Sequence, residues 1–166
     1  NHYEIPFKDF GVFIFHPVTT ELDDLENQTN ELVSGAIDSK RNYVIIYPNN
    51  DPGFSIIIDS YQQLTKSSRF KVFPSLRFEY FLTLMRSAQF IIGNSSSGIR
   101  EAPFYAVPSI NVGTRQTERS QSDKIIHTDF EFSNILAAIS RAETVTLEPF
   151  QEFGQGDSSK QFLRFL

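Results

Sequence analysis

Residues 88–112 read AQFIIGNSSSGIREAPFYAVPSINV, two short apolar runs joined by a glycine-bracketed serine loop and an amphipathic segment. The runs 88–92 and 107–112 have the length of buried strands, and 98–105 has the pattern of a helix. A strand, a crossover helix and a second strand are the repeating unit of a parallel sheet. This stretch therefore indicates an α/β fold.

The same alternation extends along the rest of the chain. Apolar runs predict further strands, and amphipathic segments predict helices between them. The expected strands are 11–15, 42–47, 70–73 and 124–127, and the expected helices are 21–37, 54–64, 78–86 and 132–142. Thr19 or Thr20 is expected to cap the first helix. A turn at Gly154 and Gly156 and a last helix ending at Leu166 complete a single domain over 1–166 with a mostly parallel sheet.

Composition excludes several classes of protein. The chain has 166 residues, 40% of them hydrophobic and 21% charged, which is ordinary for one globular domain. It contains no cysteine, which excludes disulfides, a thiolate nucleophile and cysteine-ligated metals and is compatible with a reducing compartment. Fifteen basic residues against twenty acidic ones give a net charge of -5, which argues against nucleic acid as a partner.

The length of the apolar runs and the first residue indicate whether the chain crosses a membrane and whether it is a piece of a longer protein. The apolar runs are far shorter than the roughly 20 residues of a membrane span, and we expect neither a membrane segment nor a signal peptide. The first residue is Asn1 rather than Met, which indicates a piece of a longer protein.

Polar residues that follow the expected strands are the candidates for a site, because ligands bind beyond the carboxyl ends of parallel strands. Four places qualify: His16, 49–51, 93–98 and 113–119. We expect these segments to line one rim of the sheet.

The segment GNSSSGIREAP, 93–103, has the pattern of an anion cradle. Glycines let the backbone approach a ligand, and free N–H groups at a helix start favour phosphate. The alternative is a serine-rich cap on a packed helix. The sequence has neither G-x-x-x-x-G-K-[ST] nor G-x-G-x-x-G. No serine here has one glycine two positions before it and another two positions after it, as a nucleophile elbow requires.

Charged residues around the cradle each admit two interpretations. Glu101, expected on the first turn of the helix, either interacts with the helix dipole or accepts hydrogen bonds from a ribose. Arg115 and Arg119 either grip phosphate or are ordinary surface residues. His16 is either an acid or base or a structural donor. The three histidines have no metal-ligand spacing, and we expect no metal site.

The sequence resembles a known family. GNSSSGIREAPFYAVPSINVGTRQ, 93–116, is similar to the signature of UDP-N-acetylglucosamine 2-epimerases, with the closest match to the hydrolysing branch. Phe15-His16-Pro17, YPNNDPG at 47–53 and GQGDSSKQFLRFL at 154–166 extend the resemblance over nearly the whole chain. The family implies a GT-B-type fold of two Rossmann-like, three-layer domains, of which this chain resembles the C-terminal, UDP-binding one.

The resemblance also implies roles for individual residues. It assigns Ser95 and Ser96 to the diphosphate, Glu101 to the ribose hydroxyls and Arg115 to the phosphates of UDP. Asn49 faces the nucleotide cleft, Ser75 and Leu76 contact the uracil edge, and Phe81 packs near that ring. His16 matches the histidine beside the diphosphate leaving group, where it assists departure by charge or by proton donation.

The implied reaction is loss of UDP from UDP-N-acetylglucosamine with removal of the C2 proton, then hydration to N-acetylmannosamine or a related sugar for sialic acid synthesis. It needs no metal or redox cofactor. The proton-handling carboxylates belong to the missing N-terminal domain, so this fragment is expected to bind UDP weakly and to be inactive. The family implies a cytoplasmic, homo-oligomeric enzyme. Thr117-Glu118-Arg119, where the hydrolysing enzymes usually continue toward Gly-Arg, is similar to the non-hydrolysing branch.

Two other functions remain open. The C-terminal domain of a GT-B glycosyltransferase shares the fold and the ribose-binding glutamate, but needs an acceptor. A non-catalytic α/β binding module would not respond to UDP. A flavodoxin-like receiver fits less well, because no acidic pair follows the first strand.

Overall fold

The computed structural model describes residues 3–120, 122, 124–150, 152–154 and 158–164. Gly156 and Leu166, which figured in the predicted turn and last helix, lie outside these residues. The elements in chain order are β1 (Gly11–Ile14), η1 (Leu22–Asp24), α1 (Leu25–Asp38), β2 (Tyr43–Ile46), α2 (Phe54–Tyr61), η2 (Leu64–Lys66), β3 (Phe70–Phe73), α3 (Phe78–Ser87), β4 (Phe90–Gly93), α4 (Ser97–Phe104), β5 (Ser109–Val112), β6 (Ile125–Thr128), α5 (Phe132–Thr144) and α6 (Ser158–Leu163).

The strands form one parallel sheet in the order β3-β2-β1-β4-β5-β6. The predicted α/β fold is therefore confirmed. From β3 the chain returns to place β4 beside β1, with Gly11 paired to Phe90 and Ile14 to Gly93. The strand order reverses at this pair. Such a reversal is where open parallel sheets bind ligands.

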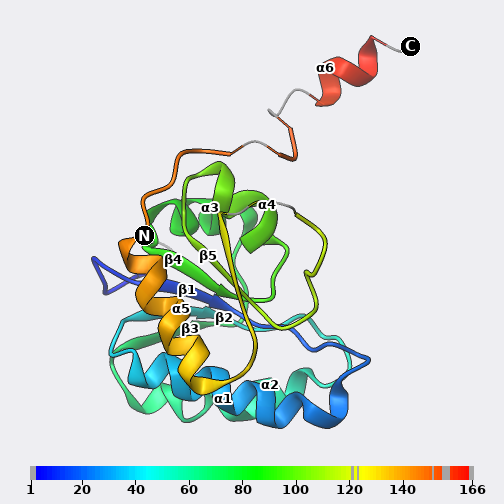
Figure 1. The fold of residues 1–166 in the computed structure, drawn as a ribbon. Coiled ribbons are helices and arrows are strands. Elements are labelled where there is room, and N and C mark those ends of the chain that lie inside the picture. Colours follow the sequence, from blue (N-terminus) through cyan, green and yellow to red (C-terminus); the bar gives the residue numbers. More distant parts are fainter. Residues whose placement is uncertain (1–2, 121, 123, 151, 155–157, 165–166) are drawn as a thin grey trace.

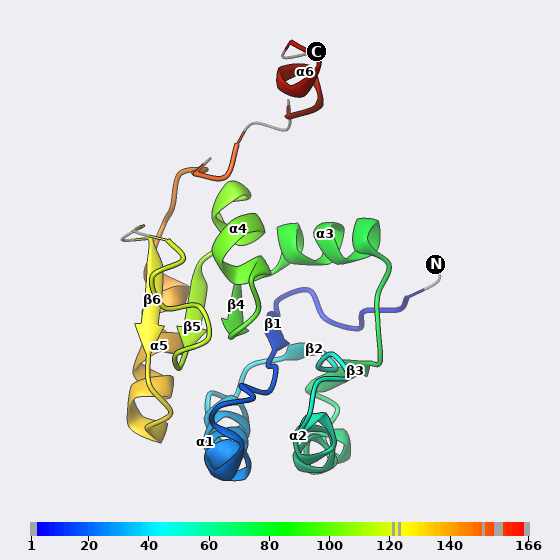
Figure 2. The same ribbon diagram turned by 90° about the vertical axis from the view of Figure 1, so that its right-hand side faces the viewer.

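Helices cover both faces of the sheet and make three layers. Figure 2 shows α3 and α4 on one side of the strands, with α1 and α2 on the other. Side chains along β1 alternate between these faces, as strand geometry requires. Phe13 and Phe15 pack into the core under α1, α2 and α5, whereas Val12 and Ile14 pack under α3 and α4. Buried residues on both faces explain why the strands are continuous apolar runs.

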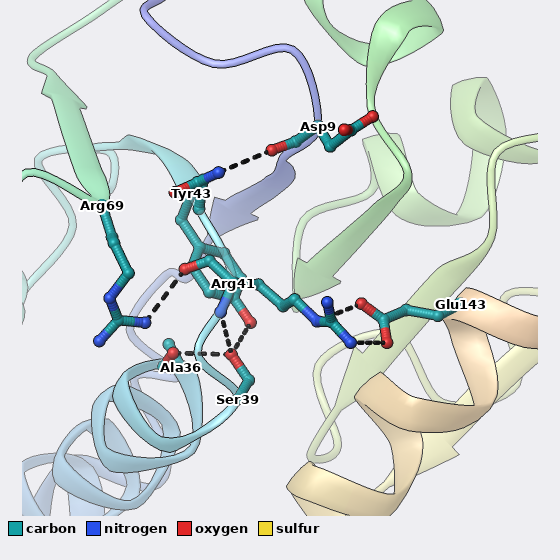
Figure 3. A network of polar contacts seen from close by, with 8 residues as sticks. Asp9, Ala36, Ser39, Arg41, Tyr43, Arg69 and Glu143 are labelled. Atoms are coloured by element: carbon teal, nitrogen blue, oxygen red, sulfur yellow. Dashed lines mark hydrogen bonds and ion pairs between the residues drawn. The ribbon is translucent and has the colours of Figure 1, made fainter.

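A polar network fastens the edge of the sheet at the amino ends of the strands (Figure 3). Arg41 forms two contacts with the Glu143 carboxylate, Nε to Oε1 at 2.5 Å and Nη2 to Oε2 at 2.7 Å, joining the start of β2 to the end of α5. Arg69 donates to the carbonyls of Ile37 and Arg41, and the Ser39 and Tyr43 hydroxyls hydrogen-bond each other. These contacts satisfy carbonyls at the end of α1.

Two expected helix boundaries are wrong. The predicted threonine cap does not form, because a turn closed by Glu21 N–H on Val18 O leaves Thr19 and Thr20 exposed. The helix then begins as the 3₁₀ turn η1, and α1 starts only at Leu25. The helix expected over 54–64 ends at Tyr61, and the separate turn η2 follows.

The C-terminal part of the chain leaves the sheet. Phe150 still contacts the body, since its N–H donates to Pro103 O across 2.9 Å. In both views α6 lies apart from the sheet and its helices (Figures 1 and 2). Among the residues described, no helix combines the length and the apolar character that crossing a bilayer requires.

Candidate nucleotide-binding site

The loop after β4 begins at Gly93, a position that has no room for any side chain. Gly93 has φ +135°, and a Cβ there would lie 1.8 Å from the carbonyl oxygen of Ile14. The missing side chain lets the ends of β1 and β4 approach, and Asn94 N–H then donates to Ile14 O across 3.2 Å. The loops after the two central strands are therefore held together at the reversal of the sheet.

Three serines follow and lead into α4. Ser95 Oγ lies 2.8 Å from Ser97 Oγ and accepts the Ser97 N–H at 3.3 Å. Ser96 is the N-cap residue of α4, but its side chain makes no capping hydrogen bond. Within the described part of the chain, the N–H groups of Ser95 and Ser96 have no acceptor. The start of α4 thus offers free donors at the positive end of the helix dipole, and the plain capping interpretation fails for Ser96.

His16 lies beside this loop with its ring held in one tautomer. The backbone N–H of Asn49 donates to His16 Nδ1 across 3.1 Å, so the proton of the neutral ring is on Nε2. The side chain is buried, with 7% of its surface exposed. Burial is the main cause that lowers the pKa of His16 to about 4, and the positive charge of Arg115 is the second. The negative charge of Asp51 acts in the opposite direction. At neutral pH the ring is an uncharged donor.

Glu101, on α4, lies near His16 and the serines, and in the described part of the chain it is the one acidic residue in the wall of the cleft that these groups line. It does not lie on the first turn of α4 as expected, because the helix begins at Ser97 rather than Gly98 and its first turn holds no acidic residue. The side chain is half-buried. Burial raises the pKa of Glu101, while its own backbone N–H and Arg100 oppose this effect. The carboxylate therefore gains from any ligand that donates hydrogen bonds to its charged form.

These groups line one cleft of about 270 Å³ between β1, β2, α3 and α4. It brings together seven predicted site residues: His16, Asn49, Leu76, Phe81, Ser95, Ser96 and Glu101. Its remaining lining residues are Ile14, Ile46, Tyr47, Phe78 and Ser97. One end of the cleft is therefore polar, around the serines, and the α3 side is apolar and aromatic, as small-molecule sites commonly are.

Two predicted site residues do not line the cleft. Ser75 is exposed on the connection from β3 to α3, next to Leu76. Arg115 lies next to the serine loop, and its Nη1 donates to Asn94 O across 3.1 Å. Burial lowers the pKa of Arg115, and nearby Asp51 opposes this effect. Arg115 reaches the same loop from the β5 side and lies close enough to His16 to affect its charge.

Two buried amides were not recognised from the sequence. Asn94 and Gln116 are each 1% exposed. Asn94 hydrogen-bonds the backbone of His16 through both side-chain atoms, and Gln116 Nε2 donates to Asn94 O across 2.9 Å. A polar residue directly after the strand-ending glycine was the available signal for Asn94. In the described ranges, no group of three or more His, Asp or Glu side chains could hold a metal ion.

A six-stranded parallel sheet with a cleft at its point of reversal defines a Rossmann-like α/β domain of the GT-B type. The family model described as UDP-N-acetylglucosamine 2-epimerase matches residues 1–166. The chain therefore belongs to the UDP-N-acetylglucosamine 2-epimerase family.

Curated relatives carry related names. A UDP-N-acetylglucosamine 2-epimerase of Neisseria meningitidis is 45% identical over 99% of this chain and 44% of its own length. A hydrolysing GDP/UDP-N,N'-diacetylbacillosamine 2-epimerase of Campylobacter jejuni is 32% identical over 82% of this chain and 36% of its own length. The chain thus spans less than half the length of these relatives.

Solved structures show the same fold. The UDP-GlcNAc 2-epimerase of Methanocaldococcus jannaschii superposes with a TM-score of 0.78 at 15% identity, over 97% of this chain and 46% of that one. A UDP-GlcNAc 2-epimerase of Neisseria meningitidis bound to UDP-GlcNAc gives 0.73 at 18% identity, over 95% and 44% of the two chains. An Escherichia coli heptosyltransferase with ADP gives 0.51 at 16% identity, over 95% and 44%.

Proposed function

We propose that this chain is the UDP-binding, C-terminal half of a hydrolysing UDP-N-acetylglucosamine 2-epimerase that serves the synthesis of sialic or related acids. The observation that carries the proposal is the meeting of three kinds of group at one cleft: the free N–H groups of Ser95 and Ser96, the neutral ring of His16 and the carboxylate of Glu101. Family membership and a hydrolysing relative support it.

The diphosphate binds at the start of α4. The N–H groups and hydroxyls of Ser95 and Ser96 donate to its oxygens, and the helix dipole favours its negative charge. Arg115, whose Nη1 donates to Asn94 O, adds a positive charge next to the same loop. Its planar guanidinium can present a second pair of donors to phosphate.

The nucleoside extends from the serines toward α3. Glu101 lies one turn along α4 and accepts hydrogen bonds from the ribose hydroxyls, a role that suits the two oxygens of a carboxylate. Leu76 and Phe81 form the apolar wall beside the uracil ring, and Ser75 lies at the outer edge of that wall. Asn49 faces the cleft from the loop after β2, where its N–H is already used by His16.

His16 assists the leaving group as a hydrogen-bond donor. Nε2–H has no partner among the described residues, so it is free to donate to a diphosphate oxygen as the C1–O bond breaks and UDP leaves with the electron pair. Its low pKa favours donation by the neutral ring over a permanent positive charge. A base outside this chain takes the C2 proton, and water then adds across the resulting C1–C2 double bond.

Titration of UDP against the isotopically labelled chain tests the binding step. We expect saturable amide shifts centred on 95–101 and Arg115. The absence of a response at millimolar UDP would contradict the proposal and favour a binding module of another kind. We also expect the isolated 166 residues to turn over nothing, because the C2 base lies outside them.

The full-length protein tests the reaction. Incubated with UDP-N-acetylglucosamine alone, it should release free UDP and a free 2-epimeric sugar in equal amounts. UDP release that requires a sugar acceptor would instead identify a glycosyltransferase. Return of the substrate as an epimeric UDP-sugar, with no free UDP, would place the protein in the non-hydrolysing branch.

A further inference from the structure

Asn94 is the residue at which the loops after β1, β4 and β5 meet. Its side-chain Oδ1 accepts the His16 N–H at 2.8 Å, and its Nδ2 donates to the His16 carbonyl oxygen at 2.9 Å. Both polar atoms of the amide are therefore bonded to the backbone of one residue, 78 positions earlier in the chain. With 1% of its surface exposed, Asn94 has little contact with solvent.

The main chain of Asn94 holds the loop after β5 in the same way. Its carbonyl oxygen accepts two hydrogen bonds, from Arg115 Nη1 at 3.1 Å and from Gln116 Nε2 at 2.9 Å. Its N–H donates to Ile14 O at 3.2 Å. Every polar group of this residue is therefore bonded to a neighbouring strand end or loop.

The groups expected to face the diphosphate lie on these same loops. His16 follows β1, Ser95 and Ser96 follow Asn94 directly, and Arg115 follows β5. Loops of this kind have no regular hydrogen-bond ladder to fix their relative positions. The hydrogen bonds of Asn94 fix these positions instead. A displacement of Asn94 would move all three sets of donors relative to one another.

We propose that Asn94 is a positioning residue of the nucleotide site, which aligns the His16 ring and the Arg115 guanidinium with the amides of Ser95 and Ser96. The effect of Asn94 on UDP binding rests on the proposed function. Its effect on the position of the His16 ring can be tested without nucleotide. The side chain does not touch the ligand in this role. It acts through the backbone of His16 and thereby through the ring that donates to the leaving group.

The asparagine amide satisfies both bonds because it carries one acceptor and one donor side by side. Aspartate would keep the acceptor for the His16 N–H but would set a carboxylate oxygen against the His16 carbonyl, and serine is too short to span both atoms. Misplacement of a catalytic group by about 1 Å can reduce rates by roughly 100-fold. We expect Asn94→Ser and Asn94→Asp to lose UDP affinity by about tenfold or more, because a misaligned hydrogen bond to a charged ligand corresponds to a factor of that size.

The test compares Asn94→Ser, Asn94→Asp and a matched control, Asn42→Ser, in the full-length protein. Asn42 also donates its side-chain amide to a carbonyl, that of Asp9 at 3.1 Å, but at the opposite edge of the sheet. The measurements are UDP affinity by calorimetry and, without nucleotide, the tautomer and titration of the His16 ring by ¹⁵N NMR. The control should match the wild type in both.

The NMR measurement separates positioning from simple loss of stability. We expect the His16 ring of Asn94→Ser to lose its fixed Nε2–H tautomer and to titrate closer to pH 6.5, the ordinary pKa of histidine. We also expect Asn94→Ser to weaken UDP binding less in a His16→Gln background than in the wild type, because the two residues act together.

The outcomes distinguish the two proposals. An Asn94→Ser protein with wild-type UDP affinity and an unchanged His16 ring overturns the positioning role, as does failure of both Asn94 variants to fold while Asn42→Ser folds. A wild type that does not bind UDP overturns the proposed function, and the ring tautomer of Asn94→Ser then still decides whether Asn94 positions His16.

Discussion

His16 and Asn49 are joined by one hydrogen bond, from the backbone N–H of Asn49 to the Nδ1 atom of the ring, across 3.1 Å. The two residues follow β1 and β2, which pair in parallel with Ile14 opposite Ile46. The register of two neighbouring strands therefore determines which nitrogen of the ring carries the proton. A donor, rather than an acceptor, is presented to the cleft before any ligand binds.

The depressed pKa of His16 predicts a loss of stability in mild acid. Between pH 6.5 and about 4 the unfolded chain binds a proton that the folded ring does not, so the free energy of unfolding falls as the pH falls through this window. The shift corresponds to about 3 kcal/mol when the pH has reached the lower value. Urea unfolding of wild type and His16→Gln at pH 7 and pH 4.5 checks this, and an equal loss in both proteins would contradict it.

Nucleotide binding should raise the lowered pKa of His16 part of the way back toward its ordinary value. A diphosphate beside Nε2 favours the charged ring, so UDP should bind with uptake of up to about one proton per site near pH 5 and with almost none at pH 8. Calorimetry in two buffers of different ionisation enthalpy measures the uptake. His16→Gln should abolish the difference between the buffers at pH 5; a difference that persists would assign the proton to another group.

The proposed ribose contact predicts a contrast between neighbours on α4. Glu101→Ala should weaken UDP binding by roughly 10- to 100-fold, the range of hydrogen bonds to a charged group, and should remove the preference for UDP over 2'-deoxy-UDP. Arg100 is the matched control, because its exposed guanidinium lies 5.2 Å from the Phe153 ring centroid and outside the cleft wall. Equal losses for Glu101→Ala and Arg100→Ala would remove the ribose assignment.

Much of the fold could be predicted because buried parallel strands are readable as apolar runs. Residues 11–15, 42–47 and 107–112 each contain an observed strand, and polar residues after such runs necessarily gather at one edge. That is why His16 and Glu101, 85 positions apart in the sequence, line the same cleft.

The errors have physical causes that no local pattern contains. Thr19 and Thr20 have good capping side chains, but the turn that Val18 closes keeps them out of the helix start. Asn94 and Gln116 matter through hydrogen bonds to atoms far along the chain or on the main chain, and a sequence shows only that both residues are polar. The contact of Arg115 with the phosphates stays a prediction: Arg115 is not among the residues that line the cleft, and its Nη1 donates to Asn94 O.

Gly93 gives the sharpest prediction about the architecture of the site. Gly93→Ala would place a Cβ 1.8 Å from Ile14 O, on a backbone with φ +135°, so β1 and β4 must separate at their ends. We expect a loss of more than about 3 kcal/mol in the free energy of unfolding, as for other strained and overpacked sites. The serine loop should shift with β4, and the surviving folded protein should bind UDP weakly.

Gly154→Ala is the control for the conformational part of that loss. Gly154 also has positive φ, +108°, but a Cβ there would meet no atom within 4 Å. Its substitution should cost only the local backbone strain, roughly 1 to 2 kcal/mol, and should leave UDP affinity unchanged. Chemical denaturation of both variants makes the comparison. Equal losses of unfolding free energy in Gly93→Ala and Gly154→Ala would contradict the prediction. The close contact between the ends of β1 and β4 would then not be what holds the site together, and the hydrogen bonds of Asn94 would have to do so alone.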